Sequence, residues 1–317
     1  MYLLTLICLF CVSFAAGRET VCPDENIDPC TCTPIGYHTS TITCNHVENG
    51  NDLQVAAFFL RNTPIRAFEI ISSAMNYLPS KVFQGLEIFK LNIYDSSFMS
   101  FSDTDTAFEG LEKTLQVLNI QETLVYNGWE WAQLRKLSML KEIYVLKSGP
   151  LTVDTDMNQI AHLNLEKLTL QNNAISFVHP YAFISFKKLK VLSMKQNEIS
   201  QLRRSMFPTP ANELLQMIFS YNKLETIPRD MFTEMPKLQS VVLASNRILS
   251  IDKNTFAPVW NNLKMLNLND NPLRCDCRMK WMLSVSFPRN SWAKCAEPQS
   301  LKGKPIQNLT SNDLWCL

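Results

Sequence analysis

Residues 165–175 read LEKLTLQNNAI, a stretch of the form LxxLxLxxNxL. The same form returns four more times toward the end of the chain, and its asparagines recur at an almost constant spacing. Such a fixed period indicates a repeat architecture, in which one structural unit is stacked many times. The asparagines that mark the five units are Asn173, Asn197, Asn222, Asn246 and Asn271.

Four weaker copies are expected before these units, and in them a hydroxyl residue takes the place of the asparagine. Three copies have Ser148, Thr123 and Ser96 at this position, and the first is assigned to residues 55–63, which end in Thr63. The spacing from Thr123 to Ser148 equals that from Ser148 to Asn173, but the step from Ser96 to Thr123 is slightly longer and the step from Thr63 to Ser96 much longer. The first repeats are therefore expected to carry insertions, and their register stays open.

Each unit has the pattern of a short strand, a turn and a return segment. Alternating apolar residues, as in LxL, form a strand with one buried face. The asparagine can hydrogen-bond the backbone of neighbouring coils, whereas serine or threonine replaces it only partly because a hydroxyl has one donor. One coil cannot bury its own apolar faces, so the units must stack into a curved solenoid with a parallel sheet on the concave side. The return segments are expected to form a stacked column that includes Phe83, Phe183, Phe207, Phe232 and Phe256.

The two ends of the chain differ from the repeats in their cysteines. Residues 1–16 form an apolar run that ends in small residues, which is typical of a signal peptide. Eight cysteines follow in two groups, at 22–44 and 275–316, and an even number of cysteines after an export signal predicts disulfides. Spacing alone allows three pairings in each group. No later stretch is long and apolar enough to span a membrane, so we expect a protein secreted to the extracellular space or matrix.

The cysteine groups lie where covers for the exposed ends of a solenoid belong. The repeat array, the front cysteine group and the sequence NPLRCDCRMKW at 271–281 resemble extracellular leucine-rich-repeat proteins with cysteine-rich caps at both ends. This resemblance implies an α/β leucine-rich-repeat solenoid, curved, with a concave parallel β-sheet and a disulfide-bonded cap at each end. It divides the chain into a signal peptide (1–16), an N-terminal cap (17–52), about nine repeats (53–274) and a C-terminal cap (275–317).

Proteins of this family pair their cap cysteines first to third and second to fourth. The front cap, VCPDENIDPCTC, and the hydroxyl residues of the early repeats are most similar to arthropod secreted members named after the non-catalytic subunit of the Oplophorus luciferin 2-monooxygenase. Membership of that group does not imply light emission, because the subunit that gives the group its name is not the catalytic one. The disulfides that the resemblance implies are Cys22–Cys32, Cys30–Cys44, Cys275–Cys295 and Cys277–Cys316.

Nothing in the sequence predicts an enzyme. The four histidines are scattered through a cap and distant repeats, and the sequence lacks the metalloprotease, serine-hydrolase and nucleotide-binding motifs. We therefore expect no catalytic residue, no metal site and no cofactor. The net charge of +1 argues against nucleic acid as a partner, since phosphate-binding surfaces are clearly basic. The motif NLT at 308–310 predicts one glycosylation acceptor, Asn308.

The concave face carries the variable positions of the repeat, because strand residues between the buried ones point there. Apolar residues at these positions form two candidate contact sites, around Tyr144 and around Tyr221, on an otherwise polar face. Exposed aromatic and aliphatic residues are typical of protein-binding hot spots, although single exposed apolar residues are also ordinary. The predicted partner-binding residues are Tyr94, Tyr144, Leu146, Ile218, Tyr221 and Val242.

Two further features have both a structural and a functional interpretation. The basic run from Lys187 to Arg204 could hold sulfated glycans by charge, but its residues fall on different faces of the coil, and a solvated edge is the preferred interpretation. Trp129 and Trp131 lie on the outer arc of an early repeat, and we expect them to pack in the core.

We therefore expect a secreted, non-enzymatic protein that binds an extracellular protein partner through its concave face, as a matrix or adhesion protein or a signalling ligand. The alternative is a non-catalytic subunit that stabilises or localises a secreted enzyme, such as a luciferase-like monooxygenase. Co-purification of an enzyme activity would distinguish the two. The sequence leaves open a homodimer through the concave sheet.

Overall fold

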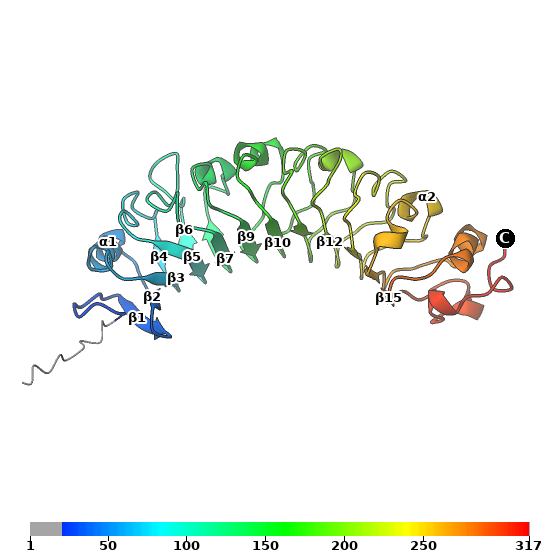
Figure 1. Cartoon of the computed structure of the whole chain (residues 1–317), viewed down its shortest axis with the longest axis horizontal. Coiled ribbons are helices and arrows are strands. Elements are labelled where there is room, and N and C mark those ends of the chain that lie inside the picture. Colours follow the sequence, from blue (N-terminus) through cyan, green and yellow to red (C-terminus); the bar gives the residue numbers. More distant parts are fainter. Residues whose placement is uncertain (1–20, 317) are drawn as a thin grey trace, which may run out of the picture.

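The computed structural model describes residues 21–316 of the chain. The predicted signal peptide, with Cys8 and Cys11, lies outside the described residues. The described part forms an arc, with one long sheet along its inner, concave side and short helical or irregular segments along its outer side (Figure 1). No helix within residues 21–316 is long and apolar enough to cross a membrane.

The concave sheet contains 12 strands, and its order follows the chain. Only β1 and β2 pair antiparallel, and every later neighbour is parallel, as expected when each coil returns to the same side before the next strand begins. The strands are β1 (Cys30–Ile35), β2 (Thr39–Asn45), β3 (Ile65–Ile71), β5 (Ile88–Tyr94), β7 (Val117–Gln121), β9 (Glu142–Leu146), β10 (Lys167–Gln171), β11 (Val191–Ser193), β12 (Gln216–Ile218), β13 (Ser240–Val242), β14 (Met265–Asn267) and β15 (Asn290–Trp292).

Three very short strands form a second parallel sheet after the turn that ends the concave strands. They are β4 (Ala74–Met75), β6 (Ser97–Phe98) and β8 (Leu124–Val125), in the order β4-β6-β8. The later coils have no strand at this place, and only single bridges such as Val153–Val178 continue the contact.

The outer side has only two α-helices among the described residues, because so short a repeat leaves little length for the return segment. The first helix, α1 (Gly50–Phe59), begins where the Asn49 side chain accepts a hydrogen bond from the Asn51 N–H at 3.0 Å. The second, α2 (Lys253–Phe256), is a single turn. The 3-10 turns are η1 (Trp131–Leu134), η2 (Thr155–Ile160), η3 (Arg204–Met206), η4 (Trp260–Asn262), η5 (Cys277–Ser284), η6 (Gln299–Leu301) and η7 (Ile306–Asn308).

The repeat register places the same residue of each unit side by side through the solenoid. Leu168 pairs with Ile143 on one side and with Leu192 on the other, and all three are completely buried. Phenylalanines of the return segments stack behind this layer: Phe183 lies 5.9 Å from Phe207, and Phe232 lies 5.2 Å from Phe256. Both the apolar strand layer and the phenylalanine column were expected from the sequence.

The repeat asparagines form a hydrogen-bonded ladder. The Asn197 Oδ1 accepts from the backbone N–H groups of Asn173 and Ile175, at 3.0 and 3.2 Å. Its Nδ2 donates to the Leu170 carbonyl of the preceding coil at 2.7 Å and to the Met194 carbonyl of its own coil at 3.0 Å. One buried amide therefore satisfies backbone groups of two coils.

The hydroxyl residues of the first coils satisfy fewer groups. The Ser148 Oγ accepts from the Thr123 N–H at 3.3 Å, but it donates to Leu146 of its own turn at 2.9 Å. The Ser73 and Ser96 hydroxyls likewise donate to carbonyls two residues before them. This difference agrees with the single donor of a hydroxyl. At Thr123 the hydroxyl lies 2.9 Å from the Gln121 carbonyl of its own turn and 3.4 Å from the Ile93 carbonyl of the preceding coil, so the contact across coils is the longer one.

The assignment of the first repeat was wrong. Residues 50–59 form α1, and the side chains of Val55 and Phe58 are exposed rather than buried in a strand. The first repeat strand is β3, in which Phe68 and Ile70 are buried, and Ser73 occupies the asparagine position.

The corrected register removes the apparent insertion before Ser96. The Ser96 hydroxyl accepts from the Ser73 N–H at 3.1 Å, just as the Asn197 side chain accepts from Asn173 in the regular coils. The helix α1 forms instead of a strand because Asn49 caps it and Leu53, Ala56 and Ala57 pack its inner face.

Two disulfides close each end of the solenoid. In the front cap, Cys30 and Cys44 are opposite each other on β1 and β2. The bonds are Cys22–Cys32, Cys30–Cys44, Cys275–Cys295 and Cys277–Cys316, the pairing that the family resemblance implies. The buried residues of both caps belong to the same core as the repeats, and a disulfide typically contributes about 2–4 kcal/mol in addition.

Candidate binding surface

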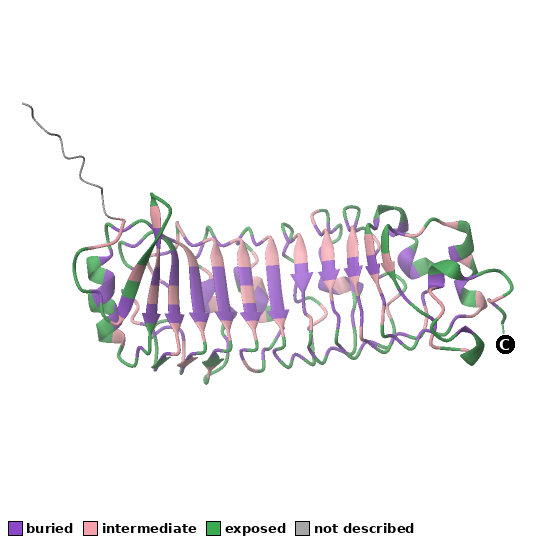
Figure 2. Ribbon diagram, turned by 90° about the horizontal axis from the view of Figure 1, so that it is seen from below, coloured by how far each residue is buried: buried purple, intermediate pink, exposed green. Residues whose placement is uncertain are grey.

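The concave face is built from alternate residues of each strand. In β10, Leu168 and Leu170 point into the core, so Lys167, Thr169 and Gln171 lie on the concave side. The parallel register carries this pattern through the sheet, so that alternate residues of successive strands form a continuous concave surface (Figure 2). The composition of this surface changes along the arc.

Over β3 to β7 the concave positions are joined by hydrogen bonds. The Asn92 Nδ2 donates to the Glu69 Oε1 at 2.8 Å, and the Asn119 Nδ2 donates to the Asn92 Oδ1 at 3.2 Å and to the Tyr94 hydroxyl at 2.8 Å. The Gln121 Nε2 donates to the Asn119 Oδ1 at 3.0 Å. Asn92 and Asn119 occupy concave positions but are buried among their neighbours.

Tyr94, predicted to contact a partner, belongs to this hydrogen-bonded surface. It is half-buried. Burial, and then the nearby negative charge of Glu69, raise the pKa of its hydroxyl. The hydroxyl therefore stays protonated, and its role within the sheet is to hold Asn119 in place.

In the middle of the arc, Tyr144 is similarly occupied. Its hydroxyl donates to the Glu142 carboxylate, and the Lys167 ammonium lies 4.9 Å from the ring centre. Burial, followed by the hydrogen bond to Glu142, raises the pKa of the Tyr144 hydroxyl. Leu146 is half-buried beside it, while Thr169 of the next strand is buried. The predicted site around Tyr144 is therefore a compact cluster whose tyrosine contacts both a carboxylate, Glu142, and an ammonium group, Lys167.

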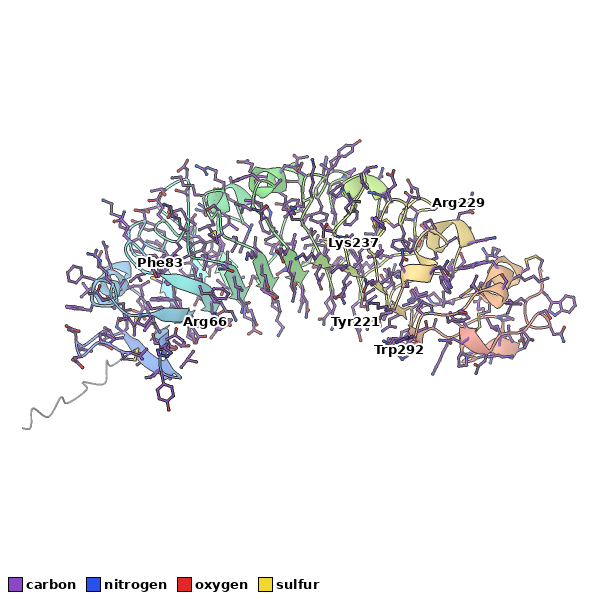
Figure 3. All side chains as sticks on the ribbon, in the orientation of Figure 1. Arg66, Phe83, Tyr221, Arg229, Lys237 and Trp292 are labelled. Carbon is purple, nitrogen blue, oxygen red and sulfur yellow. A yellow bond between two sulfur atoms is a disulfide. The ribbon has the colours of Figure 1, made fainter. Side chains whose placement is uncertain are left out.

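The concave positions of β12 to β14 carry no charged residue. We define the neutral patch as the larger apolar side chains of this part of the face. Its floor contains the small, buried Ser220 and Ala244. In Figure 3, Tyr221 and Trp292 lie on the concave side of the ribbon, whereas Arg229 lies on the outer side. The neutral patch consists of Ile218, Tyr221, Val242, Met265 and Trp292.

Tyr221 is held at the rim of the neutral patch by its backbone. It has a φ of 59°, in the left-handed region, and the equivalent residues of neighbouring coils, Gln196 and Ser245, have φ of 58° and 54°. The turn before each repeat asparagine therefore requires this conformation. The Tyr221 side chain is 53% exposed, and the Lys195 ammonium lies 5.4 Å from its ring centre. The ring has polar neighbours on one side and the neutral patch on the other.

Trp292 was not found by the sequence reasoning. It lies in the C-terminal cap, where β15 adds to the sheet and places Trp292 opposite Asn267 of β14. The side chain is 43% exposed. The sequence around it has no repeat pattern, because Ser291 occupies the place of a buried leucine. Only the strand pairing reveals that this tryptophan extends the concave face.

The remaining predicted features lie away from this surface. Arg204 of the basic run is buried, and its guanidinium donates to the backbone carbonyls of Thr233, Phe207 and Pro208. Lys190 pairs with Glu166 at 2.7 Å, so the run does not form one basic surface. Trp129 and Trp131 are buried and lie 5.2 Å apart. Within residues 21–316, no group of three or more histidine, cysteine or acidic side chains could hold a metal ion.

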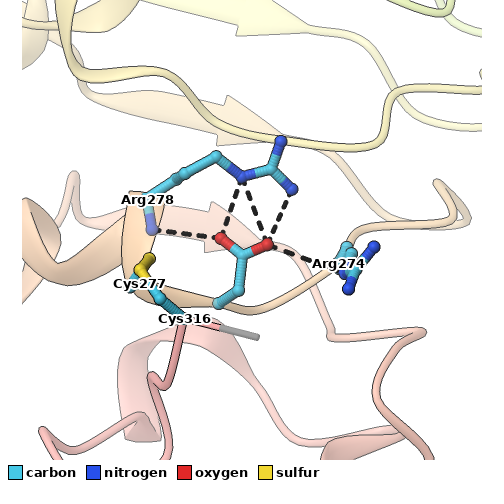
Figure 4. Close-up of a disulfide and its surroundings, with 5 residues drawn as sticks. Arg274, Cys277, Arg278 and Cys316 are labelled. Atoms are coloured by element: carbon cyan, nitrogen blue, oxygen red, sulfur yellow. Dashed lines mark hydrogen bonds and ion pairs between the residues drawn. A yellow bond between two sulfur atoms is a disulfide. The ribbon is translucent and has the colours of Figure 1, made fainter.

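The C-terminal cap holds a cleft of about 540 Å³. Beside it, Asp276 lies next to the Cys277–Cys316 disulfide and pairs with Arg278 at 2.7 Å and with Arg274 at 3.7 Å (Figure 4). The hydrogen bond from Arg278 is the main cause that lowers the pKa of Asp276. Asn308 is exposed in the same cap and accessible to modification. The carboxylates here are already paired within the chain, which indicates a structural role.

A model of the leucine-rich repeat matches residues 164–212, a segment that contains the ladder asparagines Asn173 and Asn197. The chain is a leucine-rich-repeat protein. Over 332 aligned residues, it is 21% identical to the Oplophorus-luciferin 2-monooxygenase non-catalytic subunit of Oplophorus gracilirostris, covering 92% of this chain and 87% of that protein. It is 27% identical to mouse Toll-like receptor 9 over 176 residues and 26% identical to the Drosophila melanogaster protein toll over 161 residues. These matches span only 17% and 13% of the two longer proteins.

Solved structures show the same fold. A chain of the octameric complex of Latrophilin 3, Unc5D and FLRT2 (LRR) superposes with a TM-score of 0.52, covering 93% of this leucine-rich-repeat protein and 100% of that chain. Human 5T4, the Wnt-activated inhibitory factor 1, superposes with a TM-score of 0.53 and covers 92% of this chain and 100% of its own. Both are 17% identical in sequence, so the likeness is one of fold.

Proposed function

We propose that this leucine-rich-repeat protein binds another extracellular protein through its concave face, without catalysis, and that the neutral patch is the centre of the contact. The observation that carries the proposal is the absence of charge from the concave positions of β12 to β14, beside the exposed Trp292 of β15. A rigid parallel sheet presents this surface, so its side chains lose little freedom on binding. The four disulfides support an oxidising, extracellular environment.

The neutral patch has the composition of a protein-binding centre. Tyrosine and tryptophan are enriched among residues that dominate binding energy, and they act best when apolar neighbours exclude water around them. Tyr221 and Trp292 stand at two edges of the neutral patch, with Ile218, Val242 and Met265 between them. The polar cluster around Tyr144 then lies at the rim, where complementary charges fix orientation more than affinity.

The test is affinity capture from the native extracellular fluid with the tagged protein, comparing wild type with Val242→Lys and Tyr221→Asp. Aspartate tolerates the left-handed backbone at position 221, so the second variant leaves the turn intact. Tyr37→Asp is the matched control, because Tyr37 is exposed in the front hairpin, far along the arc. We expect at least about tenfold weaker capture by both patch variants, as for loss of a hot-spot residue, and no change with the control. Equal capture by all four proteins, with unchanged thermal melting, would contradict the proposal.

A second candidate is a non-catalytic subunit that stabilises or localises a secreted enzyme. It is favoured by the match over nearly the full length of a relative named as a non-catalytic subunit. The same capture distinguishes the two functions. A stoichiometric enzyme in the eluate, lost with the patch variants, would support the subunit role; matrix or receptor proteins without activity would support adhesion or signalling. Recovery of the untagged protein alone would instead indicate a homodimer through this face.

A further inference from the structure

A second surface of the solenoid lies on the side toward which the concave strands point, along the lower edge of Figure 2. It is made by the five residues that follow the serine, threonine or asparagine of each turn, and we call it the strand-end face. In the first five coils these segments contain no charged residue. Each of the last four contains at least one, beginning with Glu198. The neutral segments are 74–78, 97–101, 124–128, 149–153 and 174–178.

Large apolar side chains are exposed on the neutral part of the strand-end face. Tyr126 and Phe177 are each 64% exposed, and Leu124 is 45% exposed. Tyr126 and Phe177 belong to coils on either side of the coil that contains Pro150. Exposed aromatic residues gathered on an uncharged surface indicate an interaction site more strongly than single apolar residues do.

The small sheet β4-β6-β8 ends within this neutral face. The Leu124 N–H donates to the Ser96 carbonyl, and the Tyr126 N–H donates to the Phe98 carbonyl, so β8 uses one of its edges to pair with β6. The next coil does not continue the ladder. Gly149 has a φ of 87°, far from that of a strand, and the Leu151 N–H, which is equivalent to that of Tyr126, donates to the Asn173 carbonyl at 3.2 Å instead of to β8. Strand β8 is therefore the edge strand of this sheet.

A groove of about 240 Å³ lies between β8 and the coil with Pro150. Its lining contains no charged residue and includes Leu124, Val125, Tyr126, Trp129, Pro150 and Leu151. Trp129 is 8% exposed, and its indole N–H has no acceptor among the described residues. The neighbouring Trp131, by contrast, donates its N–H to the Thr152 carbonyl at 3.2 Å. A buried donor without a partner is unfavourable, and an acceptor that enters beside it is correspondingly stabilised.

We propose that this groove binds an extended, uncharged peptide segment of a partner protein, laid alongside β8. An extended peptide offers main-chain groups to an edge strand and directs every second side chain into a pocket. An aliphatic or proline side chain fits the apolar space between Tyr126 and Pro150, and a peptide carbonyl can accept from Trp129. The uncharged lining disfavours acidic and basic segments, because no opposite charge repays their desolvation. This site is separate from the concave neutral patch and does not depend on it.

The probe is a phage-displayed library of random dodecapeptides, selected on the purified, disulfide-bonded protein. Enriched peptides are then synthesised with a fluorescent label and titrated by fluorescence polarisation. We expect an uncharged consensus with aliphatic or proline residues. Tyr126→Glu should weaken binding at least about tenfold, because it places a charge in the groove. Tyr37→Glu should leave binding unchanged, because Tyr37 is 90% exposed and lies outside the groove.

The Trp129→Phe variant tests the unpartnered donor. It keeps an aromatic ring against Phe101 and Trp131 but removes the N–H. We expect about fivefold weaker peptide binding. The melting temperature should not fall, because the Trp129 N–H makes no hydrogen bond within the described residues. Failure to enrich any peptide, a charged consensus, or equal binding to wild type and Tyr126→Glu would overturn the proposal. Peptides lost with Tyr221→Asp instead would also overturn it, and would assign the binding to the concave face.

Discussion

Replacement of a ladder asparagine tests how the coils are held together. Asn197 is the best site for this test because its side-chain contacts are all to backbone groups. Its oxygen is the acceptor for the N–H groups of Asn173 and Ile175, and its nitrogen donates to the carbonyls of Leu170 and Met194. The residue is 8% exposed, so water cannot easily replace these partners.

The expected loss follows from the groups left without partners. Asn197→Ala removes the acceptor of two backbone N–H groups and the donor to a carbonyl of the preceding coil. Each unsatisfied buried group costs about 1–3 kcal/mol, so we expect the free energy of unfolding to fall by at least about 3 kcal/mol. Asn197→Ser should cost less, about 2 kcal/mol. A serine can still accept from one N–H of the preceding coil, as the Ser148 hydroxyl does from Thr123, but it loses the donation across coils and the second N–H, that of Ile175.

The assay is equilibrium unfolding in urea under non-reducing conditions, followed by tryptophan fluorescence and by far-ultraviolet circular dichroism. Both probes are needed because repeat arrays unfold through coupling between neighbouring coils. The reciprocal change, Ser148→Asn, adds the missing donor and should stabilise the protein by about 1 kcal/mol. The reasoning would be refuted if Asn197→Ser and Asn197→Ala were equally destabilising, or if Asn197→Ala lowered the free energy of unfolding by less than about 1 kcal/mol.

Three further predictions concern the caps and the outer side. The hydrogen bond from Lys304 is the main cause that lowers the pKa of Asp313 from its ordinary value of 3.8 to about 2. Ionised Asp313 therefore stabilises the folded state above about pH 4, and this contribution is lost as the pH falls toward 2. The melting temperature of wild type should thus fall more steeply over that range than that of Asp313→Asn; parallel curves would contradict this. Replacing both Cys277 and Cys316 by serine should lower the free energy of unfolding by about 3–4 kcal/mol, because the bond closes a long loop of the chain. Urea titration measures this loss, and an unchanged midpoint would show that the cap is held by packing alone. Arg204→Lys should lower the free energy of unfolding by about 2 kcal/mol, because an ammonium group cannot reach all three carbonyls that the planar guanidinium binds. Thermal melting measures this change, and a fully stable variant would show that those carbonyls need no donor.

The sequence by itself determined the repeat architecture, because each buried position recurs in a chemically recognisable form. The spacing of the asparagines predicted parallel stacking, and the phenylalanines of the return segments predicted the outer layer of the core. The first repeat escaped detection, since Ser73 replaces its asparagine and the capped helix α1 places apolar residues at a competing spacing. The unusually long step from Thr63 to Ser96 was the available signal that the register was wrong.

Only the tertiary structure decided which surface residues are free to bind. Asn92 and Asn119 occupy concave positions but are buried by hydrogen bonds to side chains of the neighbouring coils. Trp292 joins the same face from a cap without any repeat pattern, through the pairing of β15 with β14. Similarly, the edge at β8 exists because the coil that contains Gly149 does not continue the ladder formed by three earlier coils. A local pattern determines which side chains are buried within a coil, whereas contacts between coils determine which of the remaining side chains are occupied and which are available.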